Sequence, residues 1–166
     1  MLILPSGCAK DGFTPKEITL IKGGEPQRQM HVLQNSIPAE NKLLRRKATK
    51  MNPHDPMLSL FIARLRVTLD DEGGVGIAAP QVGINKKIIM VMYPFQPKGK
   101  IVHSVFINPE VIKEAKETKL NWEGCLSVPA GFAKVKRPAW IVMRYHNVRG
   151  ERKEKRFEGF HTRIIL

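Results

Sequence analysis

The stretch Gly74-Val75-Gly76-Ile77-Ala78-Ala79-Pro80-Gln81 decides how the rest of this sequence is interpreted. It is not a dinucleotide-binding fingerprint, because the third glycine is missing and a helical pattern precedes it rather than a strand. It is not a Walker-type phosphate loop either, because no Gly-Lys-Ser/Thr follows. Its glycines leave bare backbone that an extended chain can approach closely. Gln81 adds a neutral amide donor suited to polarising a carbonyl group.

The residues before this stretch carry an amphipathic helical pattern. Asn52 can cap a helix and Pro53 suits its first turn, while Gly73 and Gly74 suit its end. These signals predict a helix over residues 53–71. Its apolar positions recur at the spacing of one helix face, which we expect to be buried: Leu58, Phe61, Ile62, Leu65 and Leu69.

The residues after it change to the patterns of strands. The expected strands are 88–93, 102–107 (closed by Asn108-Pro109), 139–146 and, across a turn at 147–150, 152–157. Two short stretches upstream, 18–21 and 30–33, are further strand candidates. The sequence therefore predicts an α+β fold in which one long helix packs on mostly antiparallel sheet.

Composition limits the classes of protein to which this chain can belong. Its 166 residues suit one domain, and 42% apolar residues are enough to form a core. Two cysteines are too few for a disulfide framework, and no apolar run is long enough for a transmembrane segment. The formal net charge of +13 favours RNA, an acidic partner or a membrane surface. Leu4 to Cys8 resembles the end of a lipoprotein signal, but lacks that signal's full apolar and basic regions.

A second unusual stretch is Trp122-Glu123-Gly124-Cys125-Leu126-Ser127-Val128-Pro129. Cys125 stands there in a turn-like context rather than on a regular apolar face. Its thiolate could act as a nucleophile or a metal ligand, whereas a lone cysteine is otherwise a small buried apolar residue. None of the five histidines stands at a spacing that marks it as a base or a second ligand.

Together and in this order, residues 74–81 and 123–127 resemble the first two signature motifs of the peptide deformylase family. The resemblance extends from about Leu43 to the end of the sequence, including Asn108-Pro109 and Gly159-Phe160-His161-Thr162-Arg163. Either motif alone would only be suggestive of the family, whereas both together, in this order and at this separation, are strong evidence for it.

The resemblance implies a fold and an activity. It implies a deformylase-like domain over residues 43–166, with residues 1–42 as an unassigned N-terminal segment. The implied activity is a metal-dependent amide hydrolase that removes the formyl group from the N-terminal formyl-methionine of nascent chains. Such an enzyme works in the bacterial cytoplasm or in an organelle, and the basic surface of this chain would suit contact with the ribosome.

The resemblance also implies roles for individual residues. Cys125 matches the cysteine that, with two histidines, binds the family's divalent metal, Fe2+ first with Zn2+ or Ni2+ as alternatives. The Gln81 side chain and the Leu126 N–H match the donors that stabilise the oxyanion, so both should point to one place near the Cys125 sulfur. Glu123 is expected to be structural, with Arg137 as its partner. The implied substrate-binding positions are Gly74, Val75, Gly76 and Phe160.

The sequence departs from the family at the third motif, Gln-His-Glu-x-x-His, which supplies two metal ligands and the acid–base glutamate. Leu166 stands where the Gln of that motif is expected, so Cys125 alone represents the implied ligands. We therefore expect weak metal binding, little activity and no central metal-site helix. Two interpretations remain open: a truncated deformylase, which we favour, or a deformylase-like protein that exchanged catalysis for binding.

Two classes without catalysis compete with this assignment. One is an RNA- or ribosome-binding protein, because basic residues crowd the last third of the chain. Aromatic residues make up only 7%, however, and no DNA- or RNA-binding signature occurs, so we expect no DNA partner. The other is a module that binds methionine peptides by adding a strand along residues 74–77. RNA binding that weakens with salt and is unaffected by a Cys125→Ser substitution would favour the first class over the enzyme.

Overall fold

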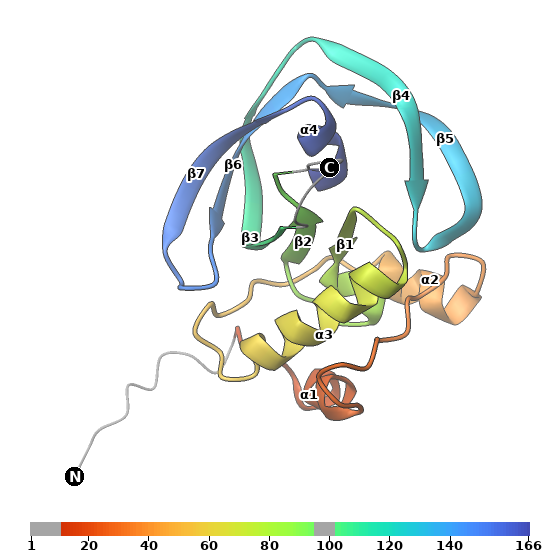
Figure 1. Cartoon of the computed structure of the whole chain (residues 1–166), viewed down its shortest axis with the longest axis vertical. Helices are drawn as coiled ribbons and strands as arrows, with labels where there is room; N and C mark the ends of the chain where they lie inside the picture. The colour runs from red at the N-terminus through yellow and green to blue at the C-terminus, as the bar shows by residue number, and fades with distance from the viewer. Residues whose placement is uncertain (1–10, 95–101) are drawn as a thin grey trace.

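The computed structural model describes residues 11–94 and 102–166, with the longer helices on one side of two sheets (Figure 1). The lipoprotein-like residues 4–8 lie outside the described residues. The helices are α1 (Pro15–Lys22), α2 (Pro38–Leu44), α3 (Leu58–Asp71), a 3-10 turn (Ala79–Val82) and α4 (Phe160–Ile165). The strands are β1 (Gly76–Ala78), β2 (Ile88–Met92), β3 (His103–Glu114), β4 (Thr118–Cys125), β5 (Val128–Pro138), β6 (Trp140–His146) and β7 (Arg152–Glu158).

All paired strands are antiparallel. Five of them form one sheet in the order β1-β2-β3-β6-β7, while β4 and β5 form a separate two-stranded hairpin. This hairpin curves over the end of the molecule opposite α3, and α4 lies between the hairpin and the larger sheet (Figure 1). The predicted α+β architecture with antiparallel sheets is therefore confirmed, although more helices and a second sheet are present.

The predicted apolar face of α3 forms the centre of the core. Leu58, Phe61, Leu65 and Leu69 are buried, and Ile62 packs against them while partly exposed. The helix begins at Leu58 rather than at the predicted Pro53. A second proline, Pro56, disfavours helical geometry at Asp55, whose carboxylate instead accepts the Met57 N–H in a tight turn.

The N-terminal residues pack on α3 and contribute to the same core. Residues 18–21 are not a strand but part of α1, which is a correction to the sequence analysis. The physical reason is a capping box: the Thr14 hydroxyl accepts the Glu17 N–H, and the Glu17 carboxylate accepts the Thr14 N–H. Ile21 is fully buried. The other candidate, 30–33, belongs to no strand, because the Met30 N–H bonds the Thr68 hydroxyl and the Leu33 N–H bonds the Gln81 carbonyl.

The predicted stop at Asn108-Pro109 is wrong, because β3 continues to Glu114. Asn108 adopts a left-handed conformation (φ 52°), and the register with β6 shifts between Ile107 and Glu110. The strand therefore passes through a bulge instead of ending. The Asn108 side chain holds the bulge in place by bonding both the N–H and the carbonyl of Met51.

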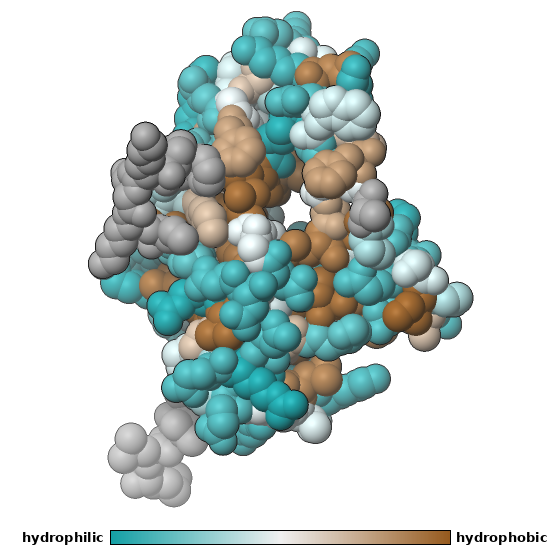
Figure 2. Space-filling model, turned by 45° about the vertical axis from the view of Figure 1, so that its right-hand side comes forward, coloured by the Kyte–Doolittle hydropathy of each residue, from teal (hydrophilic) through white to brown (hydrophobic). Residues whose placement is uncertain are grey.

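The β4–β5 hairpin was not predicted, and its apolar side chains are unusually exposed. Residues 122–129 form the ends of both strands and the turn between them rather than an isolated turn. Trp122 is 60% exposed and Phe132 is 73% exposed. Figure 2 shows apolar surface gathered around an opening beside this part of the molecule. In the described part of the chain, no helix is long and apolar enough to cross a membrane.

Candidate functional site

The two motifs singled out in the sequence lie side by side. The first motif contains β1 and the 3-10 turn that carries Gln81, and the second forms the turn between β4 and β5. Gln81 Nε2 lies 3.8 Å from Cys125 Sγ and donates to the Ser127 hydroxyl at 3.2 Å. The predicted juxtaposition of the two motifs is therefore present, at the level of individual side-chain atoms.

The Gln81 side chain is held in one orientation by its other end. Gln81 Oε1 accepts the Ala78 N–H at 2.8 Å, which closes the start of the 3-10 turn. Because the amide oxygen is engaged in this way, the amide nitrogen faces the Cys125 turn. The cap and the site thus depend on the same side chain.

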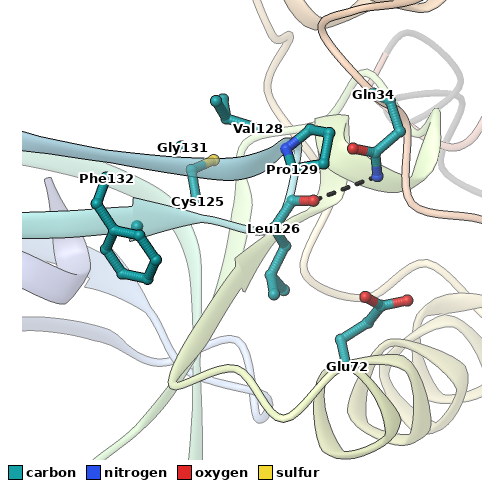
Figure 3. A pocket seen from close by; sticks show the side chains of 9 residues that line it. Gln34, Glu72, Cys125, Leu126, Val128, Pro129, Gly131 and Phe132 are labelled. Atoms are coloured by element: carbon teal, nitrogen blue, oxygen red, sulfur yellow. Dashed lines mark hydrogen bonds between the residues drawn. The ribbon is translucent and has the colours of Figure 1, made fainter.

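Residues 33–35, to which sequence analysis assigned no role, tie the two motifs together. The Leu33 N–H donates to the Gln81 carbonyl at 2.8 Å, and the Asn35 N–H donates to the Ser127 carbonyl at 2.9 Å. Between them, Gln34 Nε2 donates to the Leu126 carbonyl at 3.2 Å (Figure 3). A single short segment therefore sets the spacing between the Gln81 turn and the Cys125 turn.

The Cys125 turn borders an open cavity of about 410 Å³ (Figure 3). Cys125 is a free, exposed thiol at the end of β4. The Leu126 N–H makes no hydrogen bond among the described residues. Gln81 Nε2 lies beside Cys125 Sγ and Leu126 follows Cys125 in the chain, so both residues implied as oxyanion donors stand at the Cys125 turn. The cavity is lined by Gln34, Glu72, Gly124, Cys125, Leu126, Val128, Pro129, Gly131 and Phe132.

The glycines of the first motif allow close approach of neighbouring elements. A Cβ atom at Gly76 would lie 2.6 Å from Ile164 Cγ2 of α4, and one at Gly74 would lie 3.0 Å from Leu126 Cδ1. The Val75 carbonyl accepts the Met92 N–H at 2.9 Å. Strand β1 is the outer strand of its sheet, so one of its edges has no strand partner within the described residues. Phe160 begins α4 and is 46% exposed.

Glu123 is the centre of a structural ion-pair cluster, as predicted, and Arg137 is its partner. Arg137 donates to both carboxylate oxygens, and the Arg163 guanidinium adds a bond of 2.7 Å from α4. Arg163 also donates to the carbonyls of Lys119 and Val135. Burial raises the pKa of the Glu123 carboxyl, but the bonds and charges of Arg137 and Arg163 outweigh burial and leave that pKa lowered. Sequence analysis missed Arg163, because only the folded chain brings α4 to the hairpin.

The described residues do not form a complete metal site. Within residues 11–94 and 102–166, no group of three His, Cys, Asp or Glu lies close enough together to hold an ion. Cys125 offers one thiolate ligand, whereas hydrolytic metal sites generally have three protein ligands. The described residues therefore supply one of the protein ligands that such a site needs.

Comparison with protein families gives a match over residues 34–166 to the family described as polypeptide deformylase. A curated peptide deformylase of Thermotoga neapolitana is 36% identical over 123 residues, which cover 74% of this chain and 71% of that protein. A peptide deformylase of Roseiflexus castenholzii is 31% identical over 146 residues, which cover 81% of this chain and 79% of that protein.

Solved structures agree with these sequence matches. The Met-Ala-Ser-bound class I type b peptide deformylase of Acinetobacter baumannii is similar with a TM-score of 0.75 and 29% identity, covering 84% of this chain and 89% of that one. The peptide deformylase of Thermotoga maritima is similar with a TM-score of 0.73 and 31% identity, covering 82% of this chain and 86% of that one.

Proposed function

Because this chain belongs to the polypeptide deformylase family, we propose that it binds the formyl-methionyl end of a nascent peptide beside Cys125 and serves removal of the formyl group. The observation that carries this proposal is that Gln81 Nε2 lies 3.8 Å from Cys125 Sγ, next in the chain to Leu126, whose N–H makes no hydrogen bond among the described residues. Two such donors can stabilise negative charge on a carbonyl oxygen during amide hydrolysis.

The outer edge of β1 supports the binding part of the proposal. An extended peptide can add to an unpaired strand edge through main-chain hydrogen bonds. Gly76 lies in this strand, and Gly74 and Val75 precede it directly. We propose these three residues as substrate-binding positions, together with Phe160 for the methionine side chain.

Cys125 is proposed as one protein ligand of a divalent metal, Fe2+ or otherwise Zn2+ or Ni2+. The two histidines and the glutamate that the family resemblance implies have no match among the 166 residues. We therefore propose that these residues by themselves bind metal weakly and turn over formyl peptides slowly, while still recognising them. The cytoplasm or an organelle, where formylated nascent chains occur, is the proposed location.

A second candidate function is peptide binding without catalysis. The observation that favours it is the same open β1 edge, which needs no metal to pair with a peptide. The two functions differ in what the Gln81 and Leu126 donors add. In the first they recognise the formyl oxygen, whereas in the second the peptide backbone provides all of the affinity.

The test is a comparison of two peptides that differ only in the formyl group. Formyl-Met-Ala-Ser amide and Met-Ala-Ser amide are titrated into the full chain, and backbone amide shifts are followed by NMR. The proposal expects the formyl peptide to bind more tightly and to shift the Leu126 amide and the Gln81 side-chain amide. Equal affinity, with shifts confined to β1, would favour binding without catalysis.

A further inference from the structure

A second cavity, of about 590 Å³, lies away from the Cys125 turn and shares no lining residue with the first. It is bounded by α1, by Leu43 of α2, by Arg64 of α3 and by the loop at 82–86. Figure 1 shows α1 on the side of α3 that faces away from the sheets. Its volume is within the range of cavities that bind small organic molecules.

Part of the cavity wall is apolar. Met30, Leu33 and Val82 line it and are buried within the fold, while Leu20 and Leu43 line it and remain partly exposed. Such a wall favours a ligand with an apolar portion.

The charged part of the wall contains a buried cation without a partner. Lys86 lines the cavity and is only 3% exposed as a whole residue, and its side chain makes no hydrogen bond or ion pair with any described residue, while its Nζ is not fully sealed from solvent. Its backbone is fixed by the bridge to Thr49 and by the bond from the Lys86 N–H to the Ile84 carbonyl. Burying an unpaired charge is costly, so a group that neutralises it should bind favourably. The neighbouring Asn85 Oδ1 is also buried and accepts no hydrogen bond within the described part of the chain.

One carboxylate, that of Glu17, lines the cavity, and it forms no ion pair with Lys86. Glu17, the acidic residue among those that line the cavity, already accepts from Thr14 and from the Asn85 N–H. The remaining cations are Lys16, Arg28, Arg46 and Arg64.

Arg64 adds positive charge but cannot easily turn toward a partner. Its guanidinium donates to the carbonyls of Leu20, Ile21, Arg28 and Gln29. Burial, and after it the charge of Arg28, lowers the pKa of Arg64. Five cationic side chains line the cavity against the one carboxylate of Glu17, and a concave surface with such an excess of positive charge concentrates anions.

We propose that this cavity binds a small amphiphilic anion, whose acidic group pairs with Lys86 and whose apolar portion packs on Met30, Leu33 and Val82. The acidic group can be the carboxylate of a fatty-acid-like molecule or the phosphate of an organic monoester, since both accept charge-assisted hydrogen bonds from an ammonium group. The proposed deformylase site takes no part in this binding.

The test titrates three probes with the same tail into the full chain by calorimetry, below their self-association concentrations: octanoate, octyl phosphate and octanol. At least one anion should bind about tenfold or more tightly than octanol, consistent with a charge-assisted bond. Whichever of octanoate and octyl phosphate binds more tightly shows whether the acidic group of the ligand is a carboxylate or a phosphate. If neither anion binds more tightly than octanol, the proposal is wrong.

Variants separate the role of Lys86 from general charge. Lys86→Met, which keeps the length of the side chain, should weaken the preferred anion about tenfold and leave octanol nearly unchanged. Lys87→Met is the matched control, because Lys87 does not line the cavity. Lys16→Glu at the exposed rim of the cavity should also weaken the anion, through repulsion. Unchanged anion affinity in Lys16→Glu would overturn the proposal even if Lys86→Met failed to fold.

Discussion

Gln81 Nε2 lies 3.8 Å from Cys125 Sγ although 44 positions separate the two residues. The distance is set by residues 33–35, which bond to the main chain of both motifs. The amide is also fixed from behind, since its oxygen accepts the Ala78 N–H. One side chain therefore closes a turn with its oxygen and directs its nitrogen to the Cys125 turn, and the two contacts can be separated by mutation.

We expect Gln81→Glu to weaken formyl-peptide binding about tenfold, because it removes the donor but keeps an oxygen that accepts the Ala78 N–H. Gln81→Met should weaken binding similarly and also lower the free energy of unfolding by about 1 kcal/mol, because it removes the cap as well. Calorimetric titration measures the first effect and urea unfolding the second. Full affinity in Gln81→Glu would show that the amide nitrogen does not contact the peptide.

Glu123→Gln should lower the free energy of unfolding at pH 7 by about 2 kcal/mol, because two guanidinium groups would lose their charged acceptor. The Glu123 side chain is 17% exposed, so solvent screens the pair only in part. Urea unfolding monitored by circular dichroism measures the change. Glu117→Gln is the matched control just before the same hairpin, because Glu117 pairs with Lys119 in an exposed contact and its loss should have little effect.

The Glu123 contribution should also depend on pH with a definite sign. The folded state lowers the pKa of this carboxyl relative to the unfolded chain. Its stabilisation is therefore complete above the unfolded pKa and is lost as the pH falls through the folded one. The difference in unfolding free energy between the native chain and Glu123→Gln should be constant above about pH 5 and shrink below about pH 4. A difference that grows on acidification would contradict the charged role.

The parts of the fold that sequence predicts are those whose pattern is local. The apolar face of α3 and the apolar segment of β2 can be predicted from sequence, because apolar residues recur there at the spacing of a helix or a strand. The β4–β5 hairpin carries polar and basic residues and is largely exposed on both faces. Its sequence therefore shows no regular alternation of apolar and polar residues that would predict strands. Helix α1 was readable in principle from its Thr14–Glu17 capping box.

The candidate site divides in the same way. Gln81 and Cys125 stand in motifs that a reader can find in the chain, and their roles follow from family resemblance. Gln34 stands in no motif, and Arg163 stands in a stretch of the resemblance that was given no role. Tertiary structure alone brings them to the Cys125 turn and to Glu123. Residues that position a site are therefore harder to predict than residues that form it.

We expect Gly76→Ala to destabilise the chain by about 1–3 kcal/mol, because the new methyl group would overlap Ile164 of α4. Truncating the neighbour should relieve the clash. In an Ile164→Ala background, the cost of Gly76→Ala should fall by more than half, which a double-mutant cycle by urea unfolding measures. If the losses of unfolding free energy in the two single variants simply add in the double variant, Ile164 of α4 does not contact Gly76 of β1 as closely as the structure describes.

Adding the segment His-Glu-x-x-His directly after Leu166, which stands at the Gln position of the third motif, should create a three-ligand metal site. On a helix its two histidines lie one turn apart on one face and, directed toward Cys125, would raise the number of protein ligands from one to three. We expect the extended chain to bind one Co2+ with thiolate-to-metal absorption from Cys125 and to release formate from formyl-Met peptides. The 166-residue chain should do both weakly, as should a control extension with both histidines replaced by alanine. Robust turnover without the extension would place the ligands among His31, His54, His103, His146 and His161, whereas no gain from the extension would favour peptide binding without catalysis.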